Sequence, residues 1–242
     1  MAKAKKPEEW TVDEAIEKLD RFIGRAWFTA LQALECQNAW KVLNDSSRLT
    51  DAVNSSPCAP AASLIQDVLL QHQIIAVIRL FDKHSTDRLS FLTAQKALST
   101  PGVIEYLEQR ALNRPTKAGR NLDTLHKSIK NFICNIESLH GDEPTCISRL
   151  RNYRDSNIAH DLYFVEKPPP AYYGDIDFLL LEAIKLVNDL GLAVRSTAYD
   201  WEMRSLRVSV RALWEAAGEA RAHHDDDMIN LFPESGSAST HK

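Results

Sequence analysis

The segment from Leu64 to Phe81 reads LIQDVLLQHQIIAVIRLF and is the strongest indication of the fold class. Its side chains are apolar almost all the way round a helix, and a helix without a polar face is typical of the interior of a helical protein. We therefore expect this segment to lie at the centre of a helical bundle. Arg79 in its last turn is expected to have a structural role, paired with Asp82 or Glu105.

Helical patterns continue on both sides of this segment. Residues 13–44 repeat apolar side chains at helical spacing, and Thr11 with Glu14 forms the capping box that begins a helix. The polar stretch at 44–47 is expected to end this helix, and the serine- and proline-containing stretch at 55–60 to be a loop. Further helices are expected at residues 90–98, after Pro101, at 122–136, after Pro144, at 176–194 and at 201–214. The sequence therefore predicts an all-α bundle with one or two long helices in its C-terminal part.

The composition is that of an ordinary globular protein, with 44% hydrophobic and 26% charged residues among 242. The formal net charge of −4 argues against a protein that coats nucleic acid without specificity, but it leaves room for a local basic site. The eight glycines are few for a turn-rich all-β fold or for a glycine-rich phosphate-binding loop.

We divide the chain into a flexible N-terminus at residues 1–12, one all-α domain at 13–222 and a disordered tail at 223–242. The tail is assigned because the composition there becomes polar and rich in small residues. The charge run at 223–227 contains metal-ligand residue types, but a solvated tail is the better interpretation. We therefore expect no metal site and no cofactor.

The expected location is the cytoplasm. The four cysteines have no paired spacing of the zinc or redox kind, which is typical of free thiols in a reducing compartment. The N-terminus runs into charged residues without an apolar signal core, and we recognise no segment with the length and apolarity of a membrane span. No membrane contact is expected.

The residues from Arg151 to His160 read RNYRDSNIAH and give the strongest indication of function. On a helix, Arg154 falls on the same stripe as Leu150 and Ile158, where an apolar residue is expected. A guanidinium in that stripe needs a partner or a purpose, because an unpaired buried charge is very costly.

Asn157 and His160 follow Arg154 in steps of three, so these side chains are expected to form one polar ridge that borders the core. Two interpretations are open. In the structural one, Arg154 pairs with Asp82, Asp155 or a helix carboxyl terminus, while His160 caps the end of its helix. In the functional one, the ridge is a catalytic or binding site.

With these residues the chain resembles the HEPN superfamily of small helical-bundle proteins. The signature of that superfamily is an Arg, a polar residue directly after it and a His a few residues downstream, and Arg154, Asp155 and His160 stand in those positions. The branch it resembles is that of the abortive-infection proteins of the AbiU type. Two segments carry this resemblance, residues 75–82 with 89–92 and residues 150–160, within a similarity of order and spacing over residues 64–190.

The resemblance implies a metal-independent ribonuclease of the kind associated with phage defence and toxin–antitoxin systems. Two copies of such a chain form a homodimer in which both motifs face one cleft, with RNA as the substrate and an antitoxin protein as a further partner. The resemblance also allows an inactive relative that binds RNA, a nucleotide or a protein. A catalytically silent binding module therefore stands beside the endoribonuclease as the alternative.

RNA cleavage without a metal needs a base for the ribose 2′-hydroxyl proton and an acid for the leaving 5′ oxygen. Imidazole suits both tasks, because its ordinary pKa of about 6.5 lies near neutrality. Two copies of His160 across a dyad would supply one of each, and Arg154 would stabilise the charge that builds on the phosphorane. Asp155 would orient Arg151 or the Arg154 of the second copy. Asn157 would hold the imidazole or bind a phosphate oxygen.

Three basic residues near the motif are candidate RNA contacts, namely Arg151, Lys127 and Lys130, although ordinary surface charge is the competing interpretation of the lysines. Ser156 stands where many AbiU-like sequences have a lysine, which removes one phosphate contact. Leu162 stands where several branches have a tyrosine that an antitoxin nucleotidyltransferase modifies, so this regulation is not expected.

Overall fold

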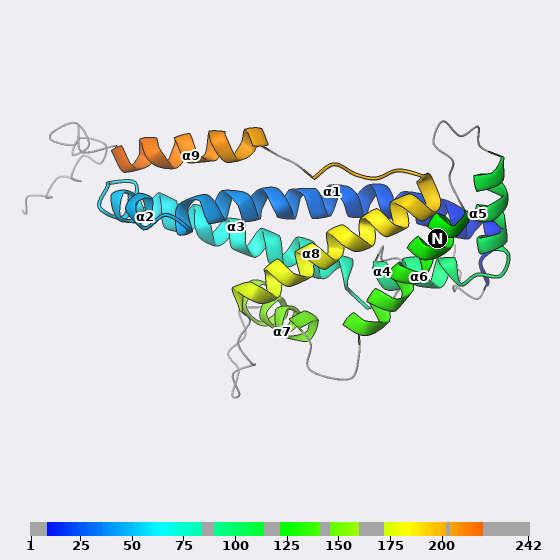
Figure 1. Ribbon diagram of the computed structural model, residues 1–242. Coiled ribbons are helices and arrows are strands. Elements are labelled where there is room, and N and C mark those ends of the chain that lie inside the picture. Colours follow the sequence, from blue (N-terminus) through cyan, green and yellow to red (C-terminus); the bar gives the residue numbers. More distant parts are fainter. Residues whose placement is uncertain are drawn as a thin grey trace, which may run out of the picture.

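The structure is a computed structural model, and it describes residues 9–83, 90–113, 122–140, 146–159, 172–201 and 204–219. The regular elements within these ranges are all helical, which confirms the predicted all-α class. They form an elongated bundle with α1 running along most of its length (Figure 1). The disordered tail predicted at 223–242 lies outside the described residues.

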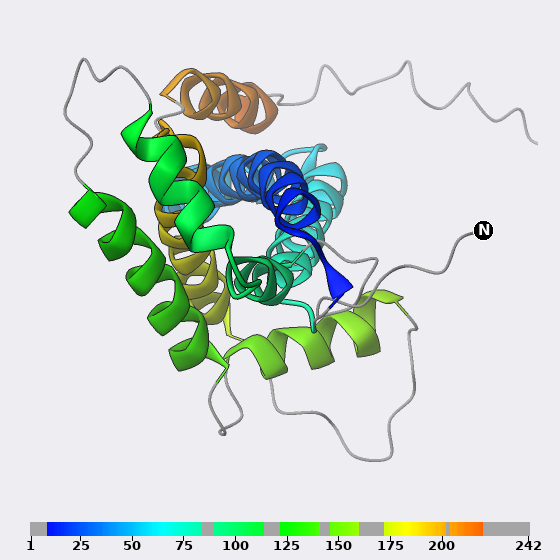
Figure 2. The ribbon, with the colours of Figure 1, turned by 90° about the vertical axis from the view of Figure 1, so that its right-hand side faces the viewer.

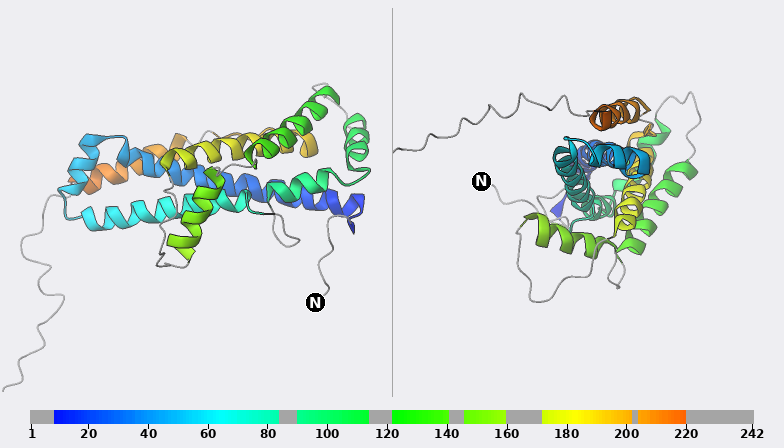
Figure 3. Two further views of the ribbon diagram at one scale, coloured as in Figure 1. Left: turned by 90° about the horizontal axis from the view of Figure 1, so that it is seen from below. Right: turned by 90° about the vertical axis from the view of Figure 1, so that its left-hand side faces the viewer.

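The helices follow one another along the chain with two π-helical turns between them. They are α1 (Val12–Asn44), α2 (Ser47–Asn54), α3 (Ala59–Leu80), α4 (Phe91–Leu98), α5 (Val103–Leu112), α6 (Leu122–Leu139), α7 (Cys146–Tyr153), η2 (Arg154–Ala159), α8 (Tyr173–Leu190), η3 (Gly191–Arg195) and α9 (Arg204–Glu219). Viewed along the bundle, α1 lies in the middle with α3, α4, α8 and α9 around it (Figure 2). α9 covers one side of the bundle and α7 crosses the opposite side (Figure 3).

The first helix begins where the sequence predicts. The Thr11 hydroxyl accepts a hydrogen bond from the backbone N–H of Glu14, and the Glu14 carboxylate accepts one from the backbone N–H of Thr11. Trp10 directly before them is only 6% exposed and belongs to the main core. The packed structure therefore includes part of the segment 1–12 that was expected to be flexible, and residues 1–8 lie outside the described ranges.

α2 is a helix that the sequence analysis missed. Ser46, in the stretch expected only to end the first helix, caps α2 by accepting a hydrogen bond from the backbone N–H of Leu49. Leu49 and Val53 are buried on one side of α2, in a small second core that they share with Leu43 and Trp214. The pattern was too short to stand out, because a helix of eight residues shows only two buried apolar positions.

α3 differs from its predicted place at the centre of the bundle. Its side chains are largely buried from Gln73 to Leu80, but Leu64, Ile65 and Val68 are 65%, 41% and 56% exposed. The prediction is wrong for the first half, because no described helix covers its outer side. By length and composition α3 also passes as a membrane-spanning candidate among the described helices, contrary to our expectation, although both criteria admit helices of soluble bundles.

The main core holds the end of α3 in place beneath the predicted motif. Phe81 and Phe91 are fully buried, with ring centroids 5.1 Å apart, and Phe91 also packs against Phe22 of α1 and Phe132 of α6. These aromatic contacts tie four segments of the chain together. Asp82, the residue after Phe81, therefore has a fixed position at the edge of the core.

Candidate functional site

The predicted motif lies on α7 and on the π-helical turn η2 that follows it. α7 buries Ile147 and Leu150 against the bundle, as the apolar stripe predicts. The chain then widens into a π-helical turn in which Ile158 is half-buried and packs against the main core, as the stripe predicts, while Ser156 is also buried. π-helical turns of this kind occur often at functional sites.

Arg154 is held by two carboxylates at the start of η2. Its Nη1 donates to Asp82 Oδ1 at 3.1 Å and its Nε donates to Asp155 Oδ1 at 2.8 Å, while the side chain is 18% exposed. Burial by itself lowers the pKa of Arg154, but the hydrogen bonds to Asp155 and Asp82 outweigh it, so the pKa is raised above its ordinary value. The guanidinium therefore stays charged and is fixed in place. Arg154 thus has the carboxylate partners that the structural interpretation expects. Its pairing does not decide between the structural and the functional interpretation.

No interaction joins Asp155 to Arg151. Asp155 pairs with Arg154 of its own chain, as the structural interpretation expects, and its predicted role toward the Arg154 of a second copy stays a prediction. Arg151 instead donates from Nη2 to the carbonyl of Phe81 at 3.0 Å, and its Nε lies 3.9 Å from Asp82 Oδ1. Arg151 thus ties α7 to the end of α3, and its predicted RNA contact stays a prediction.

Asn157 and His160 complete the predicted ridge. Asn157 is exposed, and its side-chain amide donates to the carbonyl of Tyr153 at 3.2 Å, which closes the wide turn. His160 lies outside the described residues, directly after η2. The predicted roles of both side chains stay predictions.

Lys127 and Lys130 lie on α6, and neither lines the same hollow as Arg154. Both are exposed, and the Lys127 charge acts on Asp189 of α8, partly opposing the rise in the pKa of Asp189 that burial causes. Lys130 borders a separate apolar hollow beside Ile104 and Ile133. The structure does not bring these lysines together with Arg154, and their RNA contacts remain a prediction.

A groove of about 820 Å³ opens beside Arg154, between α1 and α3. Its lining residues are Asp82 and Arg154, together with Phe22, Arg25, Ala26, Phe28, Thr29 and Gln32 of α1 and Ile75, Arg79 and Leu80 of α3. The predicted pairing of Arg79 with Asp82 or Glu105 is not found, and the exposed Arg79 has no ion pair with any residue that the structure describes. Sequence analysis missed Arg25 entirely, because an exposed arginine on a long amphipathic helix gives no local signal.

A second imidazole lies near the motif. His140 is half-buried at the end of α6, and its Nε2 has no hydrogen-bond partner among the described residues. Burial and the positive charge of Arg151 lower the pKa of His140. This side chain is therefore neutral at physiological pH. It lies near Arg151 of the motif, and the sequence did not indicate this proximity.

The position of α7 is fixed by an ion pair to α8. Arg149 donates from Nε to Asp175 Oδ2 at 2.9 Å and from a terminal nitrogen to Oδ1, and Asp175 also accepts from the backbone N–H of Tyr172 at 3.1 Å. The hydrogen bond from Arg149 lowers the pKa of Asp175, with burial opposing it. This two-point contact gives η2 a rigid base.

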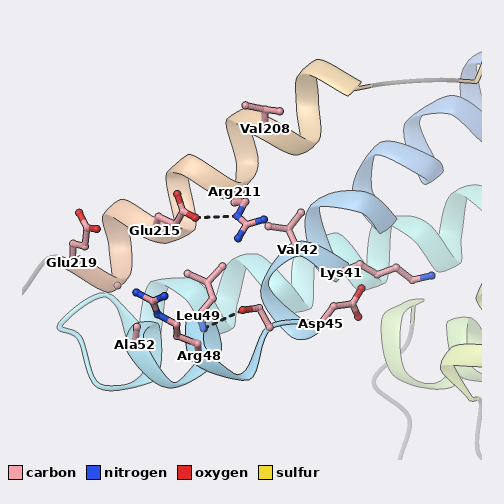
Figure 4. Close-up of a pocket in the computed structure, with 12 residues that line it drawn as sticks. Lys41, Val42, Asp45, Arg48, Leu49, Ala52, Val208, Arg211, Glu215 and Glu219 are labelled. Carbon is pink, nitrogen blue, oxygen red and sulfur yellow. Dashed lines mark hydrogen bonds and ion pairs between the residues drawn. The ribbon is translucent and has the colours of Figure 1, made fainter.

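A second hollow of about 630 Å³ lies at the other end of the bundle, between α1, α2 and α9 (Figure 4). Its charged lining residues are Lys41, Asp45, Arg48, Arg211, Glu215 and Glu219. Arg211 donates from Nε to Glu215 at 2.9 Å, as Figure 4 shows. Three positive and three negative side chains leave this hollow neutral, and none of them belongs to the predicted motif. The groove beside Arg154 is therefore the better candidate site.

Among the residues that the structure describes, no group of three or more His, Cys, Asp or Glu side chains is arranged to hold a metal ion.

Comparison with known proteins identifies a family: the family model described as AbiU2, of the HEPN class, matches residues 16–207. No curated protein and no solved structure matches the chain. The match begins within α1, ends within α9 and includes the whole motif.

Proposed function

We propose that this chain, which belongs to the AbiU2 family of HEPN proteins, is a metal-independent endoribonuclease that acts in phage defence or growth arrest. The observation that carries the proposal is the state of Arg154, a fixed and permanently charged guanidinium at the edge of an open groove. The turn that holds it leads directly to His160. A buried charge kept in this way is costly for stability, which favours a functional use.

The proposed reaction uses the 2′-hydroxyl of the substrate as nucleophile. A neutral His160 takes its proton, the 2′ oxygen attacks phosphorus, and the bond from phosphorus to the 5′ oxygen breaks as a protonated His160 of a second copy donates to that oxygen. The products are a 2′,3′-cyclic phosphate and a free 5′-hydroxyl. Arg154 stabilises the extra negative charge on the phosphorane through charge-assisted hydrogen bonds.

A homodimer is part of the proposal, because one imidazole cannot be base and acid in the same step. The outer face of α3 supports it. Leu64, Val68, Ile75 and Arg79 are separated by four, seven and four residues, so they share one side of the helix, and none of them is buried. This face begins as an apolar surface and ends at the groove, so a second copy that covers its apolar part would lie next to the groove.

A catalytically silent module that binds RNA or a protein is the second candidate. Its specific support is that Arg154 already has two carboxylate partners, which reduce the net charge available to a phosphate. Ser156 is buried at the position where many AbiU-like sequences have a lysine, and the loss of that phosphate contact also favours a binding module. In this case RNA binds without being cut. An antitoxin partner is proposed only on the analogy with the family.

The test is induced expression of the wild type, His160→Ala and Arg154→Gln in the same cells, with growth and total RNA followed. The wild type is expected to arrest growth and fragment RNA. Purified His160→Ala should cut RNA about 10²–10⁴-fold more slowly, as is typical of a lost acid–base group. Arg154→Gln should cost about 10²–10³-fold, as is typical of one lost donor to the transition state.

Arg48→Gln, which removes an exposed charge in the neutral hollow, is the matched control and should leave cleavage unchanged. Cleavage that survives His160→Ala would contradict the catalytic proposal. RNA binding by the wild type without any cleavage would support the binding module instead.

A further inference from the structure

The groove beside Arg154 concentrates positive charge on a protein that is acidic overall. Arg25, Arg79 and Arg154 line it with Asp82 as the single carboxylate, so the formal charge of the lining is three minus one, or +2. The whole chain has a formal net charge of −4. The hollow at the other end of the bundle has three charges of each sign and is neutral. The groove is therefore a locally cationic surface that selects anionic ligands.

Two of these guanidinium groups are free to bind such a ligand. Arg25 and Arg79 are exposed, and neither has an ion pair or hydrogen bond with a residue in the described part of the chain. Arg154 uses Nε and Nη1 for its carboxylates, and no described residue accepts from its Nη2. Three donors from three elements therefore converge on one groove.

The α1 wall of the groove also presents an aromatic ring. Arg25, Phe28, Thr29 and Gln32 follow one another at helical spacing, so they share one side of α1. Phe28 is 53% exposed, so much of its ring is accessible to a ligand in the groove. A ring beside free cations is the combination that binds a nucleobase together with its phosphate.

We propose that this groove takes the backbone of single-stranded RNA, with Arg25 and Arg79 binding phosphates next to the one at Arg154 and Phe28 stacking on an unpaired base. The inference rests on the proposed function and specifies the path of its substrate. A volume near 820 Å³ lies within the range of about 300–1,000 Å³ that is common for ligand sites, and suits a short stretch of nucleotides.

The single strand is favoured over a duplex because the faces of paired bases are hidden in the stack, where the Phe28 ring cannot reach them. A protein partner is a weaker fit, because the centres of protein interfaces are depleted in charge, whereas this groove carries an unpaired guanidinium on each wall. We therefore expect the groove to prefer single-stranded RNA to duplex RNA, and we expect binding to weaken as the salt concentration rises.

The test measures binding of a fluorescent, mixed-sequence RNA single strand with 2′-O-methyl groups, which cannot be cut by attack of the 2′ oxygen. Arg25→Gln/Arg79→Gln is compared with Arg48→Gln/Arg211→Gln, which removes two charges from the neutral hollow. Loss of two phosphate contacts should weaken binding about 25-fold at 0.1 M salt, and it should reduce the slope of log K against log salt by about 1.4. The control pair should change neither value.

Phe28→Ala should weaken binding of the single strand about fivefold or more, as is typical of a lost base-stacking ring, while Phe28→Tyr should retain it. Leu213→Ala, at an equally exposed apolar residue of α9, is its control. Melting curves verify that each variant is folded, which the exposure of the changed residues favours.

Equal weakening by both arginine pairs would overturn the inference, because it would indicate only general charge attraction. A change in oligomeric state of Arg25→Gln/Arg79→Gln with unchanged RNA affinity would overturn it in favour of a protein contact. Cleavage of ordinary RNA by the wild type decides the proposed function separately. If cleavage persists while the groove variants bind normally, only the substrate path is wrong.

Discussion

Asp82 and Asp155 accept hydrogen bonds from the same guanidinium, yet they should differ strongly in their effect on stability. The Asp82 side chain is 11% exposed and the Asp155 side chain is 51% exposed. Removing one partner of a buried ion pair costs about 3–5 kcal/mol. Arg154 keeps its second carboxylate and some contact with water, so we expect Asp82→Asn to lower the free energy of unfolding by about half of that, or about 2 kcal/mol.

Asp155→Asn is the matched comparison. An exposed ion pair contributes about 0.2–1 kcal/mol, so this change should cost about 0.5 kcal/mol. In a protein of this size, 1 kcal/mol shifts Tm by about 2–4 °C, which gives a decrease of about 4–8 °C for Asp82→Asn and about 1–2 °C for Asp155→Asn. Urea unfolding followed by circular dichroism measures both free energies with the same probe.

A double-mutant cycle isolates the contact itself. Asp82→Asn in an Arg154→Gln background should cost less than in the wild type, with a coupling energy of about 1 kcal/mol or more, because the nearer of the two guanidinium groups at Asp82 is gone and only Arg151, at 3.9 Å, remains. Equal effects of Asp82→Asn and Asp155→Asn, or a coupling energy near zero, would contradict a stabilising contact between Asp82 and Arg154. In that case Arg154 would be solvated and not fixed by Asp82.

Two further predictions concern other parts of the bundle. Burial and the charge of Arg151 lower the pKa of His140 from its ordinary value of 6.5, so the unfolded chain binds a proton at this imidazole more readily than the folded chain does. The free energy of unfolding should therefore fall as the pH decreases below about 6.5. His140→Gln should make this fall less steep, whereas His72→Gln, on the exposed side of α3, should leave it unchanged. An equally steep fall in His140→Gln would show that His140 does not cause it. Trp214 is 2% exposed in the second core, so Trp214→Ala should cost about 3 kcal/mol of α9 docking, seen as faster amide exchange in α9. Leu213→Ala is the control, and full protection of α9 in Trp214→Ala would show that other contacts hold it.

Local sequence patterns predicted the helices well because they depend on neighbours within a turn or two. The capping box at Thr11 and the cap at Ser90 act over three residues, and both occur where the periodic apolar segments begin. The missed helix α2 shows the limit of this signal, since Leu49 and Val53 are buried in a small core that is completed by Trp214, far along the chain.

The motif itself shows the same division. Its sequence predicted that Arg154 needs a partner and that Asp82 and Asp155 were candidates, and both contacts are present. Periodicity placed Ile158 on the core stripe, and it does pack there half-buried, but periodicity did not predict that the π-helical turn also buries Ser156. A single π-helical turn changes which side chains face the core, and the spacing of the apolar residues does not predict where such a turn occurs.

Local patterns were enough to predict the helical class, most helix positions and a charged residue on a buried stripe, because hydrophobic periodicity and capping are short-range effects. The packing of the helices could not be predicted in this way, and it leaves the first half of α3 exposed and brings Arg25, Arg79 and Arg154 to one groove. These residues come from three elements far apart in the chain. Their convergence depends on how the helices pack, and packing is set by the whole core and not by any one segment.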